Sequence, residues 1–367
     1  MNTLILTFLI VTWVIVVSVT VFGPRWSLSS NPLIHFGIRI PSEFISHQAI
    51  KDIRRSYFIK STTTGSMIAI VSILSAVLSI VSVPVSLMVA IPVYLAAHVL
   101  IYRNTHKKVK VLKTAQNWRT QLSSRIGVDT SHRNRLTVSR LWHLIPVLII
   151  VINTIAVAGY YDSIPNQIPL HYNSNGEVDK VGDKSIGIVF ATTFVQIGIT
   201  LMMFFIHEGI IRSKKQLNLQ DVAASQNQQK TFRRAHAIFL HVITILVVLT
   251  NTVIQCSIIQ VIDSGWVDWL ILILPLLIIA GAIVTSIKAK KSVELLEKIP
   301  TPHDKPYDEL EKYWKMGLFY FNKDDSALFV ERLGGNGWTV NFGRPAAWAF
   351  LVAPFVFALG LVLFTFI

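Results

Sequence analysis

The chain has 367 residues, of which 52% are hydrophobic and only 15% are charged, and its mean hydropathy is +0.54. A soluble domain carries nearer a quarter charged residues, so this composition argues against a soluble enzyme and favours a membrane bundle with loops. The formal net charge of +14 would suit nucleic-acid binding, but basic loops are also typical of membrane proteins, and we predict no specific nucleic-acid partner.

The basic residues are concentrated between the apolar runs. Of 34 Lys and Arg residues, 32 fall in four polar segments, 23–65, 103–140, 208–236 and 288–345. The other two, Lys180 and Lys184, lie in a fifth and more acidic segment, 160–186. Because cytoplasmic loops carry the excess of basic residues, this pattern predicts the first four segments inside the cell and the fifth outside.

The first apolar run covers residues 3–22 and is uncharged and long enough to span a bilayer. Its flanking charges all follow it, which predicts an N-terminus outside the cell. No basic region precedes the run and no small-residue cleavage site follows it, so we do not expect a cleaved signal peptide. Residues 36–58 predict a short extended piece and then a helix capped near Ser42.

The second apolar stretch, 66–102, has about 37 residues, which is too long for one crossing and about right for two. Pro84 marks the turn, so we predict spans over 66–82 and 84–102. Segment 103–140 then carries ten basic residues against one acid. This composition predicts a helix lying along the membrane surface or an ordinary solvated helix or loop, and the sequence leaves both readings open.

Five further spans are predicted over 142–159, 186–207, 237–259, 267–287 and 346–367. The fold class is therefore an all-α integral membrane protein of about eight transmembrane helices, with a small outer hairpin-like loop and a small cytoplasmic strand-containing module. We expect a multi-pass plasma-membrane protein, surrounded by the lipid bilayer, with both termini outside. Its predicted regions are 1–140 (N-terminal membrane region), 141–207 (helix, outer loop, helix), 208–287 (connector and two spans), 288–345 (cytoplasmic module) and 346–367 (last helix).

Ionisable residues inside spans are functional candidates by default. Here they are His98, His143, His207, Glu208 and His241, and most lie within about a turn of a span end, where contact with lipid headgroups is sufficient. Cys256 is the only cysteine, which excludes an internal disulfide and a cysteine-based metal site. We therefore predict no catalytic residue, no metal ligand and no cofactor. The deeper polar residues are expected to bond between helices or to line a solute path: Asn153, Gln196, Asn251 and Gln255.

The outer segment 164–185 predicts a compact hairpin. Asn175-Gly176 is a strong turn signal, since a type I′ turn needs two residues of positive φ, and Pro165 and Pro169 keep the approach extended. A cation could be held by some of its polar residues, His171, Glu177, Asp179 and Asp183. Their spacing matches no standard metal loop, so we favour a turn network in which they cap backbone N–H groups.

The same segment resembles a short domain of unknown function found between transmembrane helices of Gram-positive bacterial membrane proteins, of which SdpI-type immunity proteins are the best-known members. The residues that carry the resemblance are Ile168, Pro169, His171, Tyr172, Asn173, Gly176, Asp179, Gly182 and Lys184. Of these we take seven as the candidate ligand-binding motif: Pro169, His171, Tyr172, Asn173, Gly176, Asp179 and Lys184. Val178 and Val181 depart from the pattern. The resemblance implies a protein of the immunity or signal-sensing type, with a secreted peptide as partner outside and a regulator inside.

Residues 313–345 predict short strands around turns and resemble a second uncharacterised module that accompanies the first. Its candidate motif residues are Trp314, Gly317, Tyr320, Gly337, Trp338, Asn341, Gly343, Arg344 and Pro345. The glycines at 334–337 lack the spacing and the Lys-Ser/Thr pair of a phosphate-binding loop. Two alternatives to a sensing function remain: a transporter or channel for a small solute, and a membrane enzyme that uses this module.

Overall fold

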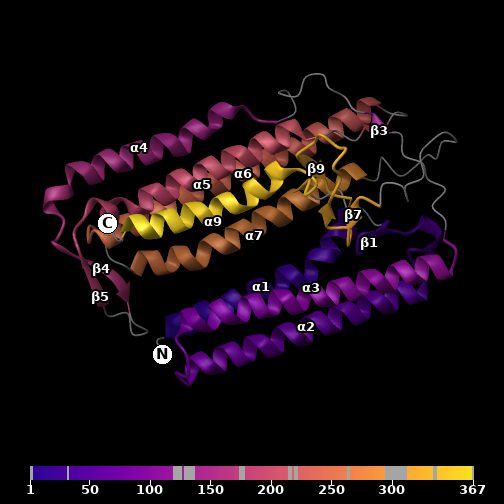
Figure 1. Ribbon diagram of the computed structural model, residues 1–367, viewed down its shortest axis with the longest axis horizontal. Coiled ribbons are helices and arrows are strands. Elements are labelled where there is room, and N and C mark those ends of the chain that lie inside the picture. The colour runs from indigo at the N-terminus through magenta and orange to yellow at the C-terminus, as the bar shows by residue number, and fades with distance from the viewer. Residues whose placement is uncertain are drawn as a thin grey trace.

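The computed structural model describes residues 3–30, 33–118, 126–127, 137–172, 178–213, 217–218, 222–262, 265–293, 312–333 and 337–365. Long helices dominate it, and strands occur only as short pairs among these residues (Figure 1). The helices are α1 (Thr3–Ser30), α2 (Gln48–Val77), α3 (Val83–Ala115), α4 (Leu144–Gly159), α5 (Ile186–Arg212), α6 (Val222–Ile258), α7 (Gly265–Val293) and α9 (Pro345–Thr365).

Six of these helices are long and apolar enough to cross a membrane, namely α1 to α6. In α7 and α9 the described apolar stretches are shorter, Ile273–Thr285 and Pro345–Phe357. The outer faces are apolar too, since Met88 is 79% exposed and Phe355 is 77% exposed, as expected for helices surrounded by lipid. The chain is a mostly helical, multi-pass membrane protein.

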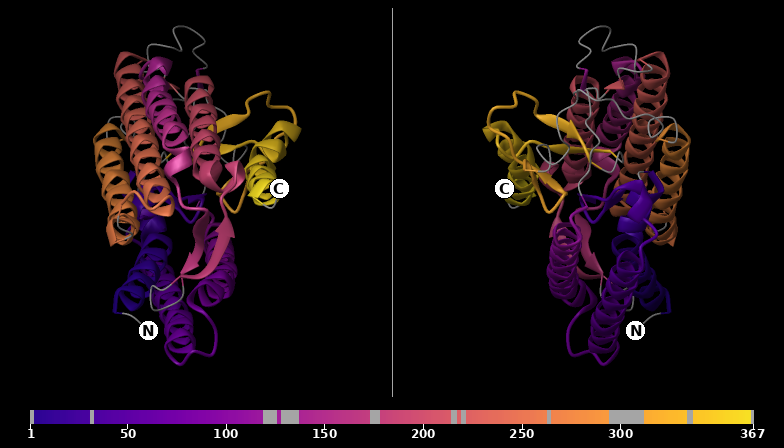
Figure 2. Two further views of the ribbon diagram at one scale, coloured as in Figure 1. Left: turned by 90° about the vertical axis from the view of Figure 1, so that its left-hand side faces the viewer. Right: turned by 90° about the vertical axis from the view of Figure 1, so that its right-hand side faces the viewer.

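The helices pack in a continuous series. Helix α3 packs on α2, α2 on α1, α1 on α7, α7 on α6, and α6 on α5, while α4 contacts both α5 and α6 and α9 packs on α5. Figure 2 shows the helices end on, with α1 to α3 on one side and the remaining helices on the other. Small residues let neighbours approach closely: a Cβ on Gly65 would lie 3.0 Å from both Val17 and Tyr94.

The first half of the chain contains the predicted helical hairpin, with its turn at residues 78–82 instead of Pro84. Pro84 lies in the first turn of α3, where its missing N–H is not needed. Helix α2 begins at Gln48 with His47 as its N-cap, so the cap predicted near Ser42 is wrong. Ser42–Phe44 forms a separate short 3-10 helix, and the helix expected within 36–58 is continuous with the span that follows.

Residues 103–115 continue α3 instead of forming a separate surface helix. Lysines are good helix formers and no Gly or Pro interrupts them, so the helix extends past the apolar run. Of the rest of segment 103–140, residues 119–125 and 128–136 lie outside the described part. Between them, β3 (Ile126–Gly127) pairs with β6 (Leu217–Asn218).

The strands gather at the two ends of the bundle (Figure 1). One end carries both termini and the antiparallel pair β4 (Gln167–Tyr172) and β5 (Val178–Asp183), whose register shifts between Pro169 and His171. The opposite end carries β1 (Ile34–His35), β2 (Ile38–Arg39), β7 (Trp314–Lys315), β8 (Phe319–Tyr320), β9 (Phe329–Glu331) and β10 (Trp338–Val340).

The turns of two hairpins meet at this second end. Gly37 lies in the β1–β2 turn with φ +79°, and Gly317 lies in the β7–β8 turn with φ +68°. A Cβ added to either glycine would overlap the backbone of the other. Met316 and Leu318 also pack against the buried cluster that contains Phe36. The N-terminal hairpin and the C-terminal module therefore form one packed unit.

Candidate functional site

The β4–β5 hairpin packs against the ends of three helices, α4, α5 and α6. Ile168 is 1% exposed and packs in one cluster with Val157 of α4, Val189 of α5 and Ile259, which directly follows α6. The Lys184 Nζ donates to the carbonyl oxygens of Ile164 (2.9 Å) and Tyr161 (3.3 Å) and lies 5.2 Å from the centre of the Tyr161 ring. Lys184 therefore has a structural role at the base of the hairpin.

The remaining predicted ligand-motif residues are only partly placed. Pro169 pairs with Val181 and Asp179 is exposed. His171 and Tyr172 belong to β4, but the structure does not describe their side chains, and Asn173, Gly176 and Glu177 lie outside the described residues. The turn network predicted for this loop, and the cation site considered beside it, therefore stay predictions.

In the C-terminal module, Asn341 is the organising residue. It is fully buried, and its Nδ2 donates to the carbonyl oxygens of Asn322 (2.8 Å) and Asp325 (3.0 Å). Its Oδ1 accepts from the backbone N–H groups of Asn322 and Gly343, each at 3.0 Å. A Cβ on Gly343 would lie 2.6 Å from the backbone of Asn322. Through these contacts, the Asn341 side chain holds the turn at residues 322–325 against the backbone at Gly343.

The other motif residues of the module also have structural contacts. The Tyr320 hydroxyl donates to Asp325 (3.0 Å), and burial raises the pKa of Tyr320 to about 12, so the phenol stays a donor at neutral pH. Trp314 is buried beside it, and Gly337 has φ +83°. Arg344 donates its N–H to the Asn341 carbonyl, and Pro345 begins α9, a position that proline favours.

Three of the four deep polar residues bond between helices, whereas Asn251 donates to the Val247 carbonyl (2.9 Å) within α6. Asn153 donates to Gln255 Oε1 (2.6 Å), and the Gln255 Nε2 donates to the Val189 carbonyl (2.8 Å). Gln196 donates to the Val248 carbonyl (3.1 Å) and to Thr252 (3.0 Å). These amides join α4, α5 and α6, which is the interhelical role that the sequence predicts.

Three histidines from three helices meet near the other end of α4, α5 and α6. His143 ends the 3-10 helix Arg140–His143 that leads into α4, His207 lies in α5 and His241 in α6. They are 6%, 0% and 1% exposed. One ring nitrogen from each lies within 4.8 Å of the others. The ring centre of His241 is 4.3 Å from that of His143 and 4.8 Å from that of His207.

The hydrogen bonds of this histidine cluster leave several ring nitrogens unused. The His241 Nδ1 lies 2.6 Å from the Ala237 carbonyl oxygen, so it carries a proton and Nε2 keeps a lone pair. The His143 Nε2 lies 3.2 Å from the His207 Nδ1, where either can donate. Within the described part of the chain, the His143 Nδ1, His207 Nε2 and His241 Nε2 have no partner. Buried polar atoms without partners are costly.

Charged residues border the cluster at the end of α5. Glu208 forms ion pairs with Arg140 and, at 3.0 Å, with Arg212. These ion pairs hold the Glu208 carboxylate between Arg140, which begins the 3-10 helix, and Arg212, which ends α5. Trp142 contacts the ring of His241 and Phe204 contacts that of His143. The cluster is thus three imidazoles enclosed by aromatic rings, with a set of charges beside it.

Sequence reasoning treated these histidines one at a time and missed their convergence. A signal was present: His143 begins one span, His207 ends the next and His241 is near the start of the third. Consecutive spans alternate in direction, so these three positions fall at the same end of the bundle. Considering the three spans together would have predicted the cluster.

Two family models match parts of the chain. One is described as a domain of unknown function (DUF1648) and covers residues 148–195, and the other is described as a family of unknown function (DUF5808) and covers residues 323–348. The chain contains two uncharacterised modules. The first match contains the whole 164–185 motif, and the second contains the part of the C-terminal motif from Gly337 to Pro345 but not Trp314, Gly317 and Tyr320. No curated protein and no solved structure matches the chain.

Proposed function

We propose that the chain is a non-enzymatic plasma-membrane protein of the immunity or signal-sensing type that binds a divalent transition-metal ion at His143, His207 and His241. The observation that carries the proposal is the convergence of three buried imidazoles from three helices, with ring nitrogens within 4.8 Å of one another. This departs from the sequence-based expectation of no metal ligand.

The donor set defines the class of ion. Imidazole nitrogen suits Zn²⁺, Cu²⁺, Ni²⁺ and Fe²⁺ and does not suit Mg²⁺ or Ca²⁺, which prefer oxygen. Three histidines leave a coordination position open for water or another ligand. The His241 Nε2 keeps a lone pair and has no partner among the described residues. This supports the assignment, because a metal ion would satisfy a lone pair that is otherwise buried at a cost.

We further propose eight spans with both termini outside the cell. Supporting this, both termini lie at the β4–β5 end of the bundle (Figure 1), and the four strongly basic segments of the sequence connect helices at the other end. The positive-inside rule then puts the histidine cluster near the cytoplasmic face. On this arrangement a secreted peptide would meet the β4–β5 hairpin, and a regulator would meet the C-terminal module.

Metal binding is tested on the purified protein in mild detergent after chelator treatment. Titration with Co²⁺, followed by its visible absorption, is expected to show one nitrogen-coordinated ion per chain. His207→Gln and His241→Gln should each weaken binding at least tenfold, because each removes one of three ligands. His236→Gln is the matched control: His236 lies on α6, and its Nδ1 lies 2.9 Å from the Phe232 carbonyl oxygen. Equal binding by all variants, or none by the wild type, contradicts the proposal.

The immunity part of the proposal has its own test. A strain that lacks the gene is expected to become more sensitive to at least one secreted killing factor of related bacteria, and the wild-type gene should restore growth. A variant with the 167–183 hairpin replaced by a Gly/Ser linker should fail to restore it. Unchanged sensitivity of the deletion strain across a broad panel of factors rules out immunity.

A further inference from the structure

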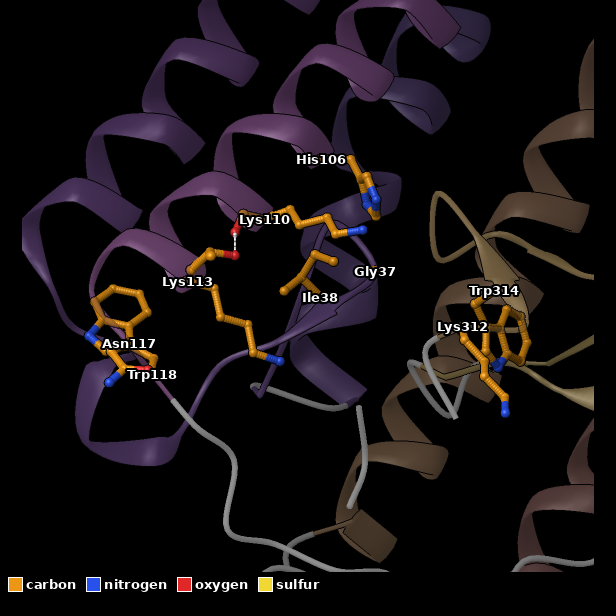
Figure 3. Close-up of a pocket in the computed structure, with 10 residues that line it drawn as sticks. Gly37, Ile38, His106, Lys110, Lys113, Asn117, Trp118, Lys312 and Trp314 are labelled. Carbon is orange, nitrogen blue, oxygen red and sulfur yellow. Dashed lines mark hydrogen bonds between the residues drawn. The ribbon is translucent and has the colours of Figure 1, made fainter. Parts of the chain in front are cut away.

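A cavity of about 400 Å³ lies at the junction of the N-terminal hairpin, the end of α3 and the C-terminal module. Figure 3 shows the residues that line it. They come from three parts of the chain: Gly37 and Ile38 from the β1–β2 hairpin, His106, Lys110, Lys113, Thr114, Asn117 and Trp118 from α3 and the residues after it, and Lys312 and Trp314 from the module. The cavity is separate from the histidine cluster.

The lining is basic. Lys110 and Lys113 are three residues apart, so they share one face of α3. Lys312 lines the cavity from the module side, where its Nζ lies 4.8 Å from the centre of the Tyr313 ring (Figure 3). None of the described lining residues is acidic. Like charges that the fold brings together in a concave site attract an anion, since the low-dielectric walls concentrate their field.

The floor and walls supply aromatic and polar groups at fixed positions. Trp118 is 5% exposed and stacks on Phe44 with ring centres 4.7 Å apart. His106 is held by a contact of 2.8 Å between its Nδ1 and the Phe36 carbonyl oxygen. Thr114 donates to the Lys110 carbonyl oxygen at 3.0 Å. Because these groups are fixed by the fold, the cavity is a shaped site and not a loose cluster of surface lysines.

The position relative to the bilayer also points to a phosphate. The apolar part of α3 ends near Tyr102, and Lys110 lies eight residues further, about 12 Å along a helix axis at 1.5 Å per residue. This is the level of the headgroups and the water just beyond them. Both a phospholipid headgroup and a soluble phosphorylated molecule can reach such a site.

We propose that this cavity binds a phosphate-bearing anion, with the ammonium groups of Lys110, Lys113 and Lys312 on the phosphate and with Trp118 and Trp314 as walls. Lysine binds phosphate as a point charge. Because Lys312 comes from the C-terminal module, the bound anion also stabilises the contact between that module and α3. Ligand binding then adds to the stability of the folded protein by mass action.

The test uses the full chain purified in neutral detergent, with two probes: inorganic pyrophosphate and a short-chain phosphatidic acid. Binding is followed by tryptophan fluorescence and by the shift in melting temperature. The wild type should bind at least one probe, and K110Q/K113Q should bind it at least tenfold more weakly. K312Q should weaken binding from the opposite wall. The matched control is K107Q/K108Q, which removes two exposed lysines from the same helix outside the cavity and should change binding less than twofold.

The outcomes separate the sources and decide the proposal. Binding of pyrophosphate alone indicates a soluble phosphorylated ligand, and binding of phosphatidic acid alone indicates a lipid headgroup. Binding of both probes indicates a site that accepts phosphate from either source. Equal losses of probe affinity in K110Q/K113Q and K107Q/K108Q would show that the probe is attracted by the general positive charge of the surface, and would overturn the proposal. Failure of the wild type to bind either probe overturns it too.

Discussion

Replacing Arg233 by methionine is expected to lower the free energy of unfolding by about 3–5 kcal/mol, the usual cost of removing one partner from a buried charged network. Arg233 is fully buried on α6. Its guanidinium donates to the carbonyl oxygens of Ile210 (2.5 Å) and Ser213 (3.3 Å) at the end of α5. It also lies 5.9 Å from the centre of the Trp338 ring. A methionine fills the space but removes the donor to both carbonyls, and the Ile210 carbonyl then keeps the bond from the Ser213 hydroxyl (2.9 Å).

The same substitution removes the positive charge that stabilises the Glu331 carboxylate. Burial raises the pKa of the Glu331 carboxyl, and the charge of Arg233 opposes that rise. A carboxyl whose pKa is raised in the folded state binds protons more readily there, so it favours folding at acid pH and opposes folding as pH rises. The loss in the free energy of unfolding caused by Arg233→Met should therefore become smaller as pH is lowered.

Chemical unfolding in detergent measures both effects. Arg234→Met is the control, since Arg234 is the exposed neighbour and should change stability by less than about 0.5 kcal/mol. The double variant Arg233→Met, Glu331→Gln should recover part of the loss, because no buried carboxylate then lacks a counter-charge. Equal stability of Arg233→Met and Arg234→Met would show that the buried network is unimportant.

Replacing Gly317 by alanine is expected to cost about 2–4 kcal/mol, from two sources. An alanine with positive φ is strained by about 1–2 kcal/mol, and the new Cβ would overlap the Gly37 backbone. Backbone cannot move aside as a flexible side chain can, so the β1–β2 and β7–β8 turns must separate. The melting temperature in detergent should fall accordingly.

Gly337→Ala supplies the matched comparison for Gly317. Gly337 has φ +83°, but a Cβ there meets no atom of the described residues within 4 Å. It therefore carries the strain of the left-handed backbone without the collision. The difference between the two variants isolates the contact between the hairpins. If both lose the same stability, the contact between Gly37 and Gly317 contributes nothing.

Hydropathy and charge predicted most of the fold, because lipid contact imposes a simple rule on apolar runs. The helical hairpin of α2 and α3 and the strand pair in the outer loop were both expected from the sequence. Helix ends were predicted less well: α3 continues through Lys107 to Ala115, since polar helix formers extend a helix without changing its hydropathy signal. Apolar runs in α7 and α9 suggested spans, yet the described apolar stretches there are short.

The candidate sites depend on contacts between distant residues, which periodicity does not report. His143 and His241 are separated by nearly a hundred residues of sequence, and each looked like an ordinary residue near a helix end. The packing of Gly37 on Gly317 was equally invisible, because nothing in either turn specifies its partner. Conversely, the C-terminal motif was recognised as a unit, and the contacts of Asn341 explain why its residues occur together.

The meeting of Gly37 and Gly317 has a consequence for biosynthesis. Gly317 follows Gly37 by 280 residues, which at a synthesis rate of about 5–20 residues per second is roughly 15–55 s of translation. During that interval the nascent hairpin around Phe36 has no module to cover it. A ribosome-bound or truncated chain would expose this apolar surface to chaperones and proteases, whereas a finished chain conceals it.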